Sequence, residues 1–135
     1  YNADFVRKSS NDWDFSKEGR IRQANRMKTF ADFERSYGRW VVCDFVAPTN
    51  KSREAFAPDY VIWLDTIKEG RVVSSKLSEL KNIENLPFDA NTLSQSKEFE
   101  DTNNVFEKPS IVDTHITHFM SDNEIEKLAG EMMNV

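Results

Sequence analysis

The chain has 135 residues, of which 39% are hydrophobic and 30% are charged, and its formal net charge is −5 at pH 7. This length suffices for one domain with one core, and the composition excludes the disordered and fibrous classes. The negative balance argues against a nucleic-acid partner, because nucleic-acid-binding proteins present a basic face. A local site for a small anion is compatible with it.

Compartment signals point to a reducing environment. Cys43 is the only cysteine, so no disulfide can form within the chain, and we expect a cytoplasmic location. Within the apolar run "WVVCDFV", Cys43 is expected to be a small buried hydrophobe and not a reactive thiol. No apolar run approaches the roughly 20 residues that cross a bilayer, so no membrane partner is expected. The chain starts with Tyr1 and without a signal-peptide pattern, and we expect an N-terminally incomplete domain.

The first residues, "YNAD", are predicted to be the tail of a strand whose beginning is absent. Asp4 would lie just beyond the strand end, with Arg7 about one helical turn later. An acid and a cation so placed can hold a sugar hydroxyl and a phosphate. The local pattern alone favours a solvated ion pair.

A helix is predicted over residues 18–37, with Ser16 as its N-cap and Gly38 as its C-terminal stop. Its apolar positions recur at helical spacing. Arg20 falls in the first turn, where the helix dipole disfavours a cation, so a bound anion and an ordinary surface role are both open. Phe15 is either a hydrophobic staple or a face on which a base stacks. Arg22 and Arg26 are expected to be surface residues paired with Glu18 or Glu34.

Strands are predicted over residues 39–48, 59–66 and 114–120. The first two runs are continuously apolar, which is typical of parallel strands buried on both faces. The loop over residues 44–54 offers Asn50, Lys51 and Arg53, either to a phosphate or merely as a strand-to-helix connection. Residues 74–86 are weakly helical, residues 87–98 resemble a flap, and Ser121 with Glu124 forms a capping box that opens the last helix.

Helices alternating with buried strands predict an α/β three-layer sandwich with a parallel sheet. In such folds the ligand site lies at the carboxyl ends of the strands. This places Asp4, residues 44–48 and residues 65–66 on one rim.

Several sites are excluded or disfavoured. The chain has only 4 glycines and contains neither a phosphate-loop motif nor a G-x-G-x-x-G motif. His115 and His118 would lie on opposite faces of a strand, which disfavours a shared metal ion. No metal site is predicted.

Taken in order, five segments resemble the adenylylsulfate kinases, and in particular a short kinase-like branch of that family. They are "NADFVRK", "DWDFSKEGRIRQANRM", "VVCDFVAP", "VIWLDTIKEGR" and "FEDTNNVFEKP". The resemblance implies a P-loop kinase fold and transfer of the ATP γ-phosphate, with Mg²⁺, to the 3′-hydroxyl of adenylylsulfate. It also implies a small-molecule nucleotide as partner and, from the habit of the family, a homodimer.

The resemblance assigns roles to individual residues. Asp4 matches the acid next to the accepting hydroxyl, a general-base position. The substrate-binding positions are Arg7 and Arg20 for the anionic groups, Phe15 and Phe99 for the adenine, Gln23 where the family has asparagine, and Val46 and Ala47. Ala47 replaces the usual serine.

The chain departs from the family in two places. The opening strand, the phosphate loop and the following helix, which hold ATP and Mg²⁺, are absent, so this chain would supply the acceptor half and is not expected to turn over ATP alone. Residues 72–98 form a lid-like insertion in the single domain 1–135. The alternative is a catalytically inactive nucleotide-binding or protein-interaction domain derived from that family.

Overall fold

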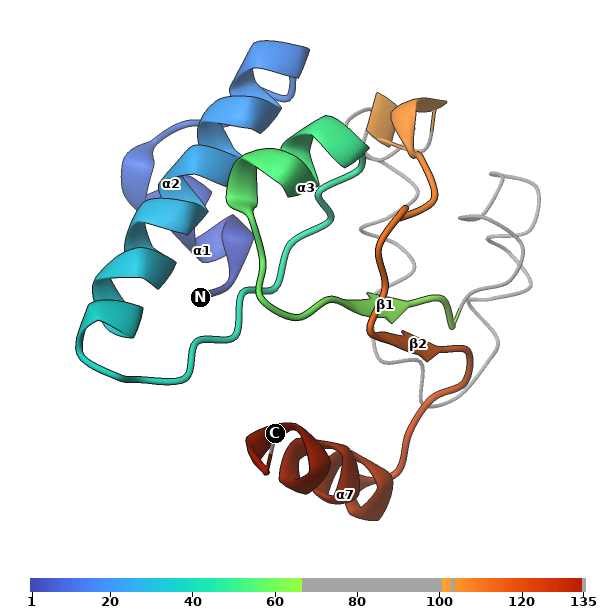
Figure 1. Cartoon of the computed structure of the whole chain (residues 1–135). Coiled ribbons are helices and arrows are strands. Elements are labelled where there is room, and N and C mark those ends of the chain that lie inside the picture. Colours follow the sequence, from blue (N-terminus) through green and yellow to red (C-terminus); the bar gives the residue numbers. More distant parts are fainter. Residues whose placement is uncertain (67–100, 103, 135) are drawn as a thin grey trace.

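The computed structural model describes residues 1–66, 101, 102 and 104–134, which form a mixed α/β arrangement (Figure 1). Phe99 and the whole predicted lid-like insertion over 72–98, including its predicted helix over 74–86 and its predicted flap over 87–98, lie outside these residues. The described elements, in chain order, are α1 (Ala3–Ser10), α2 (Lys17–Ser36), α3 (Asn50–Phe56), β1 (Ile62–Leu64), β2 (Thr114–Ile116) and α7 (Asp122–Met133).

Helix α1 begins where the sequence predicted the tail of a strand. Only Asn2 has strand character, through a parallel bridge to Asp44, and the helix starts at the next residue. The reason is local: the Asn2 side chain accepts hydrogen bonds from the backbone N–H groups of Asp4 and Phe5. Asparagine at this position satisfies N–H groups that have no partner within the helix.

The longest helix follows the prediction closely. In α2 the Ser16 hydroxyl accepts from the Gly19 N–H, and Gly38, with φ +71°, follows the last turn. This left-handed conformation suits glycine and ends the helix. The capping box of α7, between Ser121 and Glu124, is confirmed as well.

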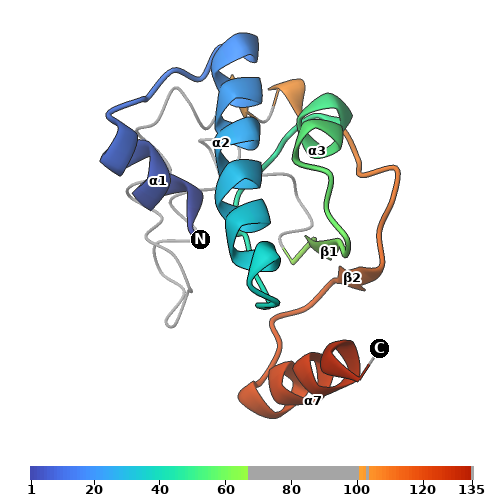
Figure 2. The same cartoon turned by 60° about the vertical axis from the view of Figure 1, so that its left-hand side comes forward.

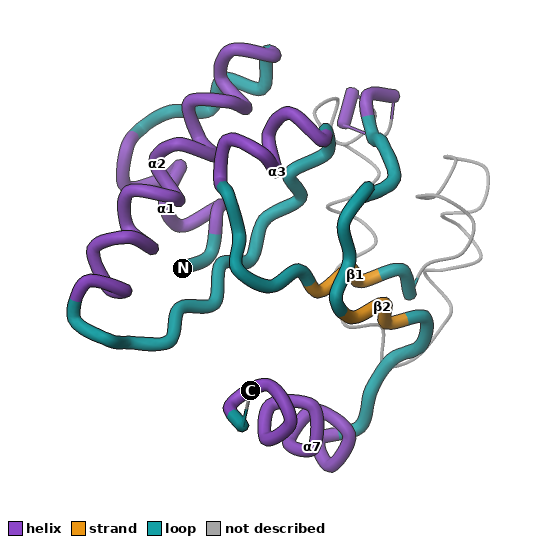
Figure 3. The backbone as a smooth tube through the Cα atoms, in the orientation of Figure 1, coloured by secondary structure: helices purple, strands orange, loops and turns teal. Residues whose placement is uncertain are grey.

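Among the residues that the structure describes, the sheet is smaller than predicted. Strands β1 and β2 pair in parallel, with Ile62 opposite Thr114 and Leu64 opposite Ile116. The run over 39–48 forms no strand beyond the bridge at Asp44 and connects α2 to α3 as an extended loop (Figure 3). The prediction that these runs are buried on both faces is wrong. Val42 is 77% exposed and Leu64 is 63% exposed, because no described helix covers these side chains.

Among the described residues, most of the buried apolar side chains lie between α1, α2 and α3, and the sheet contributes one of them. Figure 2 shows α1 and α3 on either side of α2, with α7 set apart from them. The buried apolar side chains are Val6 from α1, Ala24, Met27 and Ala31 from α2, and Ile116 from β2. Within the described residues, none of the helices has the length and apolar character needed to cross a bilayer.

Candidate functional site

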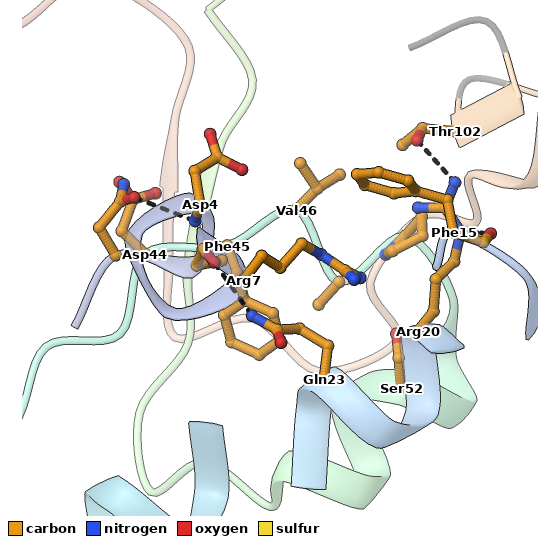
Figure 4. A pocket seen from close by; sticks show the side chains of 14 residues that line it. Asp4, Arg7, Phe15, Arg20, Gln23, Asp44, Phe45, Val46, Ser52 and Thr102 are labelled. Atoms are coloured by element: carbon orange, nitrogen blue, oxygen red, sulfur yellow. Dashed lines mark hydrogen bonds between the residues drawn. The ribbon is translucent and has the colours of Figure 1, made fainter. Parts of the chain in front are cut away.

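A cavity of about 190 Å³ lies where α1 and α2 begin and where the α2–α3 connection approaches α3 (Figure 4). The predicted site residues within the described part of the chain all border it: Asp4, Arg7, Phe15, Arg20, Gln23, Val46 and Ala47. The structure thus brings together side chains from three separate stretches of sequence.

The bridge between Asn2 and Asp44 builds this corner. The Asp44 N–H donates to the Tyr1 carbonyl at 2.9 Å, and the Ala3 N–H donates to the Asp44 carbonyl at 2.9 Å. These bonds fix the start of α1 beside residues 44–48, so that Asp4 and Val46 border the same space. Residues 65–66, which were predicted to lie on the same rim, do not line this cavity. They follow β1, which pairs with β2.

Arg7 is buried in the wall of the cavity, with 5% of its surface exposed. Its Nη1 donates to the carbonyls of Asp12 at 3.0 Å and of Asp14 at 3.1 Å. Burial lowers the pKa of Arg7; nearby Asp12 acts in the opposite direction, and the charge of Arg20 lowers it further. A guanidinium keeps its charge nonetheless, because its ordinary pKa is above about 12.

Arg20 completes the cationic part of the cavity. Its Nε donates to the Phe15 carbonyl at 2.9 Å, and its Nη2 donates to the Thr102 hydroxyl at 2.8 Å. Burial lowers the pKa of Arg20, while the charge of Asp101 opposes this shift.

Within the described part of the chain, neither Arg7 nor Arg20 forms an ion pair with a carboxylate. Buried charges in proteins are normally paired, because desolvation of an unpaired charge is costly. Two like charges that share one cavity therefore favour an anion between them.

Arg22 and Arg26 differ from these two arginines. Arg22 binds the Asp12 carboxylate at 2.7 Å, and Arg26 binds the same carboxylate at 2.8 Å. The expected pairing with Glu18 or Glu34 is wrong. The chain between α1 and α2 turns back toward α2 and presents Asp12 to these side chains, while Glu34 binds Arg39 at 2.7 Å.

The Phe15 ring lies close to the guanidinium groups of both Arg7 and Arg20. The Arg7 Cζ lies 4.4 Å from the centroid of its ring, and the Arg20 Cζ lies 5.5 Å from it. Both distances are within the range of cation–π attraction. Since Ser16 is the N-cap, the partner position of a hydrophobic staple belongs to Arg20, a cation, so the contact is not an apolar staple.

Gln23 and Asp4 have different surroundings in the cavity. Gln23 is 3% exposed; its Nε2 donates to the Ala3 carbonyl at 3.1 Å, and its Oε1 accepts from Arg26 at 2.6 Å. Its amide therefore ties the start of α1 to α2.

Asp4 lies in the first turn of α1 with an exposed side chain at one end of the cavity, and Figure 4 shows Phe15 and Arg20 at the other end.

The other predicted polar groups have partners elsewhere. Arg53 donates to the carbonyls of Pro48 and Glu107, so it ties α3 to its surroundings. His115 lies 2.9 Å from Asp65 and stacks on Trp63, and His118 lies 2.9 Å from Glu124. The described residues contain no cluster of His, Cys, Asp or Glu that could hold a metal ion.

Three further residues contribute to the site and were not predicted from the sequence: Asn2, Asp12 and Thr102. Asn2 followed by Asp4 is a recognisable helix start, and this signal was available in the sequence. Thr102 and Arg20 are separated by 82 positions, and no local pattern relates them.

Chemically, the cavity can hold an anion on the guanidinium groups, with a carboxylate at the opposite end and an aromatic ring beside the cations. Comparison of the chain with protein-family models, with curated proteins and with solved structures gives no match.

Proposed function

We propose that this cavity binds an anionic adenine nucleotide of the adenylylsulfate type and serves as the acceptor site of an adenylylsulfate kinase-like phosphotransferase. One observation carries the proposal: the buried Arg7 and the half-buried Arg20 border one cavity, and neither forms an ion pair with a carboxylate among the described residues. The resemblance to adenylylsulfate kinases, carried by "NADFVRK" and "DWDFSKEGRIRQANRM", supplies the identity of the ligand.

The ligand's charge matches the cavity. The sulfonated phosphate of adenylylsulfate carries negative charge on both of its anionic groups, and guanidinium groups suit phosphate and sulfate oxygens because their N–H donors are fixed in a plane. A bound anion would offset the cost of burying these cations. The described cavity is smaller than the roughly 300–1,000 Å³ of typical small-molecule pockets, so its walls suit the anionic groups and the adjoining sugar.

The remaining roles follow the resemblance. Phe15 offers a ring edge and the part of its face not covered by the arginines to the adenine, and Phe99 is proposed as the second aromatic wall. Asp4 is proposed to accept the proton of the sugar 3′-hydroxyl, because its carboxylate borders the cavity at the end away from the cations. Val46 and Ala47 would pack along the sugar.

The proposed parent fold is a three-layer P-loop kinase, which uses ATP and Mg²⁺ as the donor pair. The printed chain contains no phosphate-loop motif, whose backbone N–H groups and lysine hold the donor phosphates. We therefore expect this chain to bind the acceptor nucleotide without catalysing ATP-dependent turnover by itself.

Isothermal titration calorimetry tests the proposal. Adenylylsulfate should bind the native chain, and Arg20→Ala should weaken binding roughly 10- to 150-fold, because charge-assisted hydrogen bonds contribute about 1.5–3 kcal/mol each. Arg35→Ala is the matched control: Arg35 lies on the same helix, pairs with Asp32 and Asp59, and does not border the cavity. Equal affinity in native and Arg20→Ala chains would refute the proposal.

A further inference from the structure

We propose that Asp12 is a positioning residue for the anion site: through its carboxylate it holds the loop whose carbonyls orient the Arg7 guanidinium. The inference rests on the proposed function for its effect on ligand binding. Its structural part concerns the ligand-free protein and stands on the following contacts.

The Asp12 carboxylate anchors the loop between α1 and α2 to two arginines of α2. Arg22 Nε donates to its Oδ2 at 2.7 Å, Arg22 Nη2 donates to its Oδ1 at 2.9 Å, and Arg26 Nη2 donates to its Oδ2 at 2.8 Å. The side chain of Asp12 is only 13% exposed. Two-pronged binding of a carboxylate by a guanidinium fixes orientation as well as distance.

The same loop holds Arg7 from the backbone. Arg7 Nη1 donates to the carbonyl oxygens of Asp12 and Asp14, and the Asp12 N–H donates to the Arg7 carbonyl at 3.1 Å. The Asp14 N–H donates to the Asp12 Oδ1 at 3.2 Å, which couples the side chain of Asp12 to the second of these carbonyls. Movement of the Asp12 carboxylate would therefore move both acceptors of Arg7.

Arg26 extends the connection to the other side of the cavity. Its Nη1 donates to Gln23 Oε1 at 2.6 Å, and Gln23 Nε2 donates to the Ala3 carbonyl. Asp12 is thus linked through Arg26 to the start of α1, where Asp4 lies. Asp12 itself does not border the cavity, so it acts on a ligand only through other residues.

The arginines have different partners in this loop. Arg22 and Arg26 form ion pairs with the carboxylates of Asp12 and Asp14, whereas Arg7 donates only to neutral carbonyl oxygens of the same loop. The loop thereby orients the Arg7 guanidinium without neutralising its charge. A carboxylate in the place of those carbonyls would compete with an anionic ligand.

The test uses Asp12→Asn, which keeps the size of the side chain and the backbone carbonyl but removes the charge. The control is Asp32→Asn, which removes another α2-bound carboxylate, paired with Lys28 and Arg35, away from the cavity. The first readout is the side-chain NMR signal of Arg7 without ligand. In Asp12→Asn, rotation of the Arg7 guanidinium should become fast and its N–H groups should exchange at least about tenfold faster with water, because exchange reports local opening. An Arg7 signal identical to native would overturn the inference whatever the protein binds.

The second readout is the dissociation constant for adenylylsulfate in a double-mutant cycle with Arg7→Ala. Asp12→Asn should weaken binding by about tenfold in the native background and by less than about twofold when Arg7 is already absent, because residues that act through one another are not additive. Equal losses in both backgrounds would show a general structural role and overturn the positioning role. If native protein binds no adenylylsulfate, the proposed function fails, and the NMR readout alone decides the inference.

Discussion

The guanidinium carbon of Arg7 lies 4.4 Å from the centroid of the Phe15 ring. Arg20 reaches the same ring from the first turn of α2, so one aromatic side chain contacts both cations that border the cavity. This arrangement stabilises neighbouring like charges before any ligand arrives, since each cation–π contact contributes about 0.5–2 kcal/mol. It also places an apolar ring next to the proposed anion site.

Substitution of Phe15 separates its two proposed roles. Phe15→Leu should weaken adenylylsulfate binding by roughly 10-fold or more, because both cation–π contacts and a stacking face are lost together. Binding of inorganic pyrophosphate, which has no base, should weaken less than binding of the nucleotide. Calorimetry with both ligands measures the difference.

The control for this experiment is Phe5→Leu, since Phe5 is 69% exposed on α1 and does not border the cavity. Equal losses for nucleotide and pyrophosphate in Phe15→Leu would show that the ring supports the arginines without contacting a base.

Gly19 is expected to be intolerant of a side chain. A Cβ at this position would overlap the carbonyl oxygen of Asp14 and lie 2.5 Å from its Cγ, and that carbonyl is an acceptor of Arg7. Gly19→Ala should therefore displace the loop, lower the unfolding free energy by about 1–3 kcal/mol and weaken anion binding. Thermal unfolding with and without ligand measures both effects.

Gly130 provides the matched comparison, because a Cβ there meets no atom within 4 Å. It lies in α7, and Gly130→Ala should stabilise the chain by about 0.5–1 kcal/mol through helix propensity. If Gly19→Ala were as stable as native, the close packing of α2 against Asp14 would be disproved.

The capping box of α7 predicts a pH dependence. Hydrogen bonds lower the pKa of Glu124 from its ordinary 4.5 to about 2; the largest contribution comes from the Ser121 N–H and the next from the His118 side chain. Because the folded-state pKa is lowered, the contribution of Glu124 to stability is complete above about pH 4.5 and is lost as the pH falls toward 2. An NMR titration of the Glu124 carboxyl carbon measures this pKa directly.

Glu124→Gln should remove this part of the acid sensitivity, and the difference in stability between native and variant should shrink as the pH falls from about 5 to 2. A Glu124 midpoint at its ordinary value would contradict the cap geometry.

The helices with local end signals were predictable from the sequence. Ser16 and Gly38 bracket α2, and Ser121 opens α7, because caps satisfy backbone groups with residues adjacent in the chain. Helix α1 differs from the predicted strand because Asn2 forms both the strand-like bridge to Asp44 and the cap of the helix.

The extent of the strands was not predictable in this way. A continuous apolar run indicates burial on both faces only when other elements cover both faces. Val42 and Leu64 are exposed, so the apolar pattern over 39–48 and 59–66 does not correspond to full burial within the described residues.

The site was partly predictable. The residues named from the resemblance that the structure describes border one cavity, but the local pattern gave Arg22 and Arg26 the wrong partners. Ten or more positions separate these arginines from Asp12, beyond the three- and four-residue steps that relate neighbours on a helix face. The contact of Arg20 with Thr102 likewise joins residues that are far apart in the sequence, so only the tertiary fold brings them together.

The most direct test of the central claim is a crystal structure of the chain with adenylylsulfate. We expect ligand density in the cavity, with oxygens of the sulfonated phosphate about 2.7–3.0 Å from the guanidinium nitrogens of both Arg7 and Arg20. Ligand density away from both arginines, or an empty cavity at a nucleotide concentration that saturates binding in solution, would contradict it.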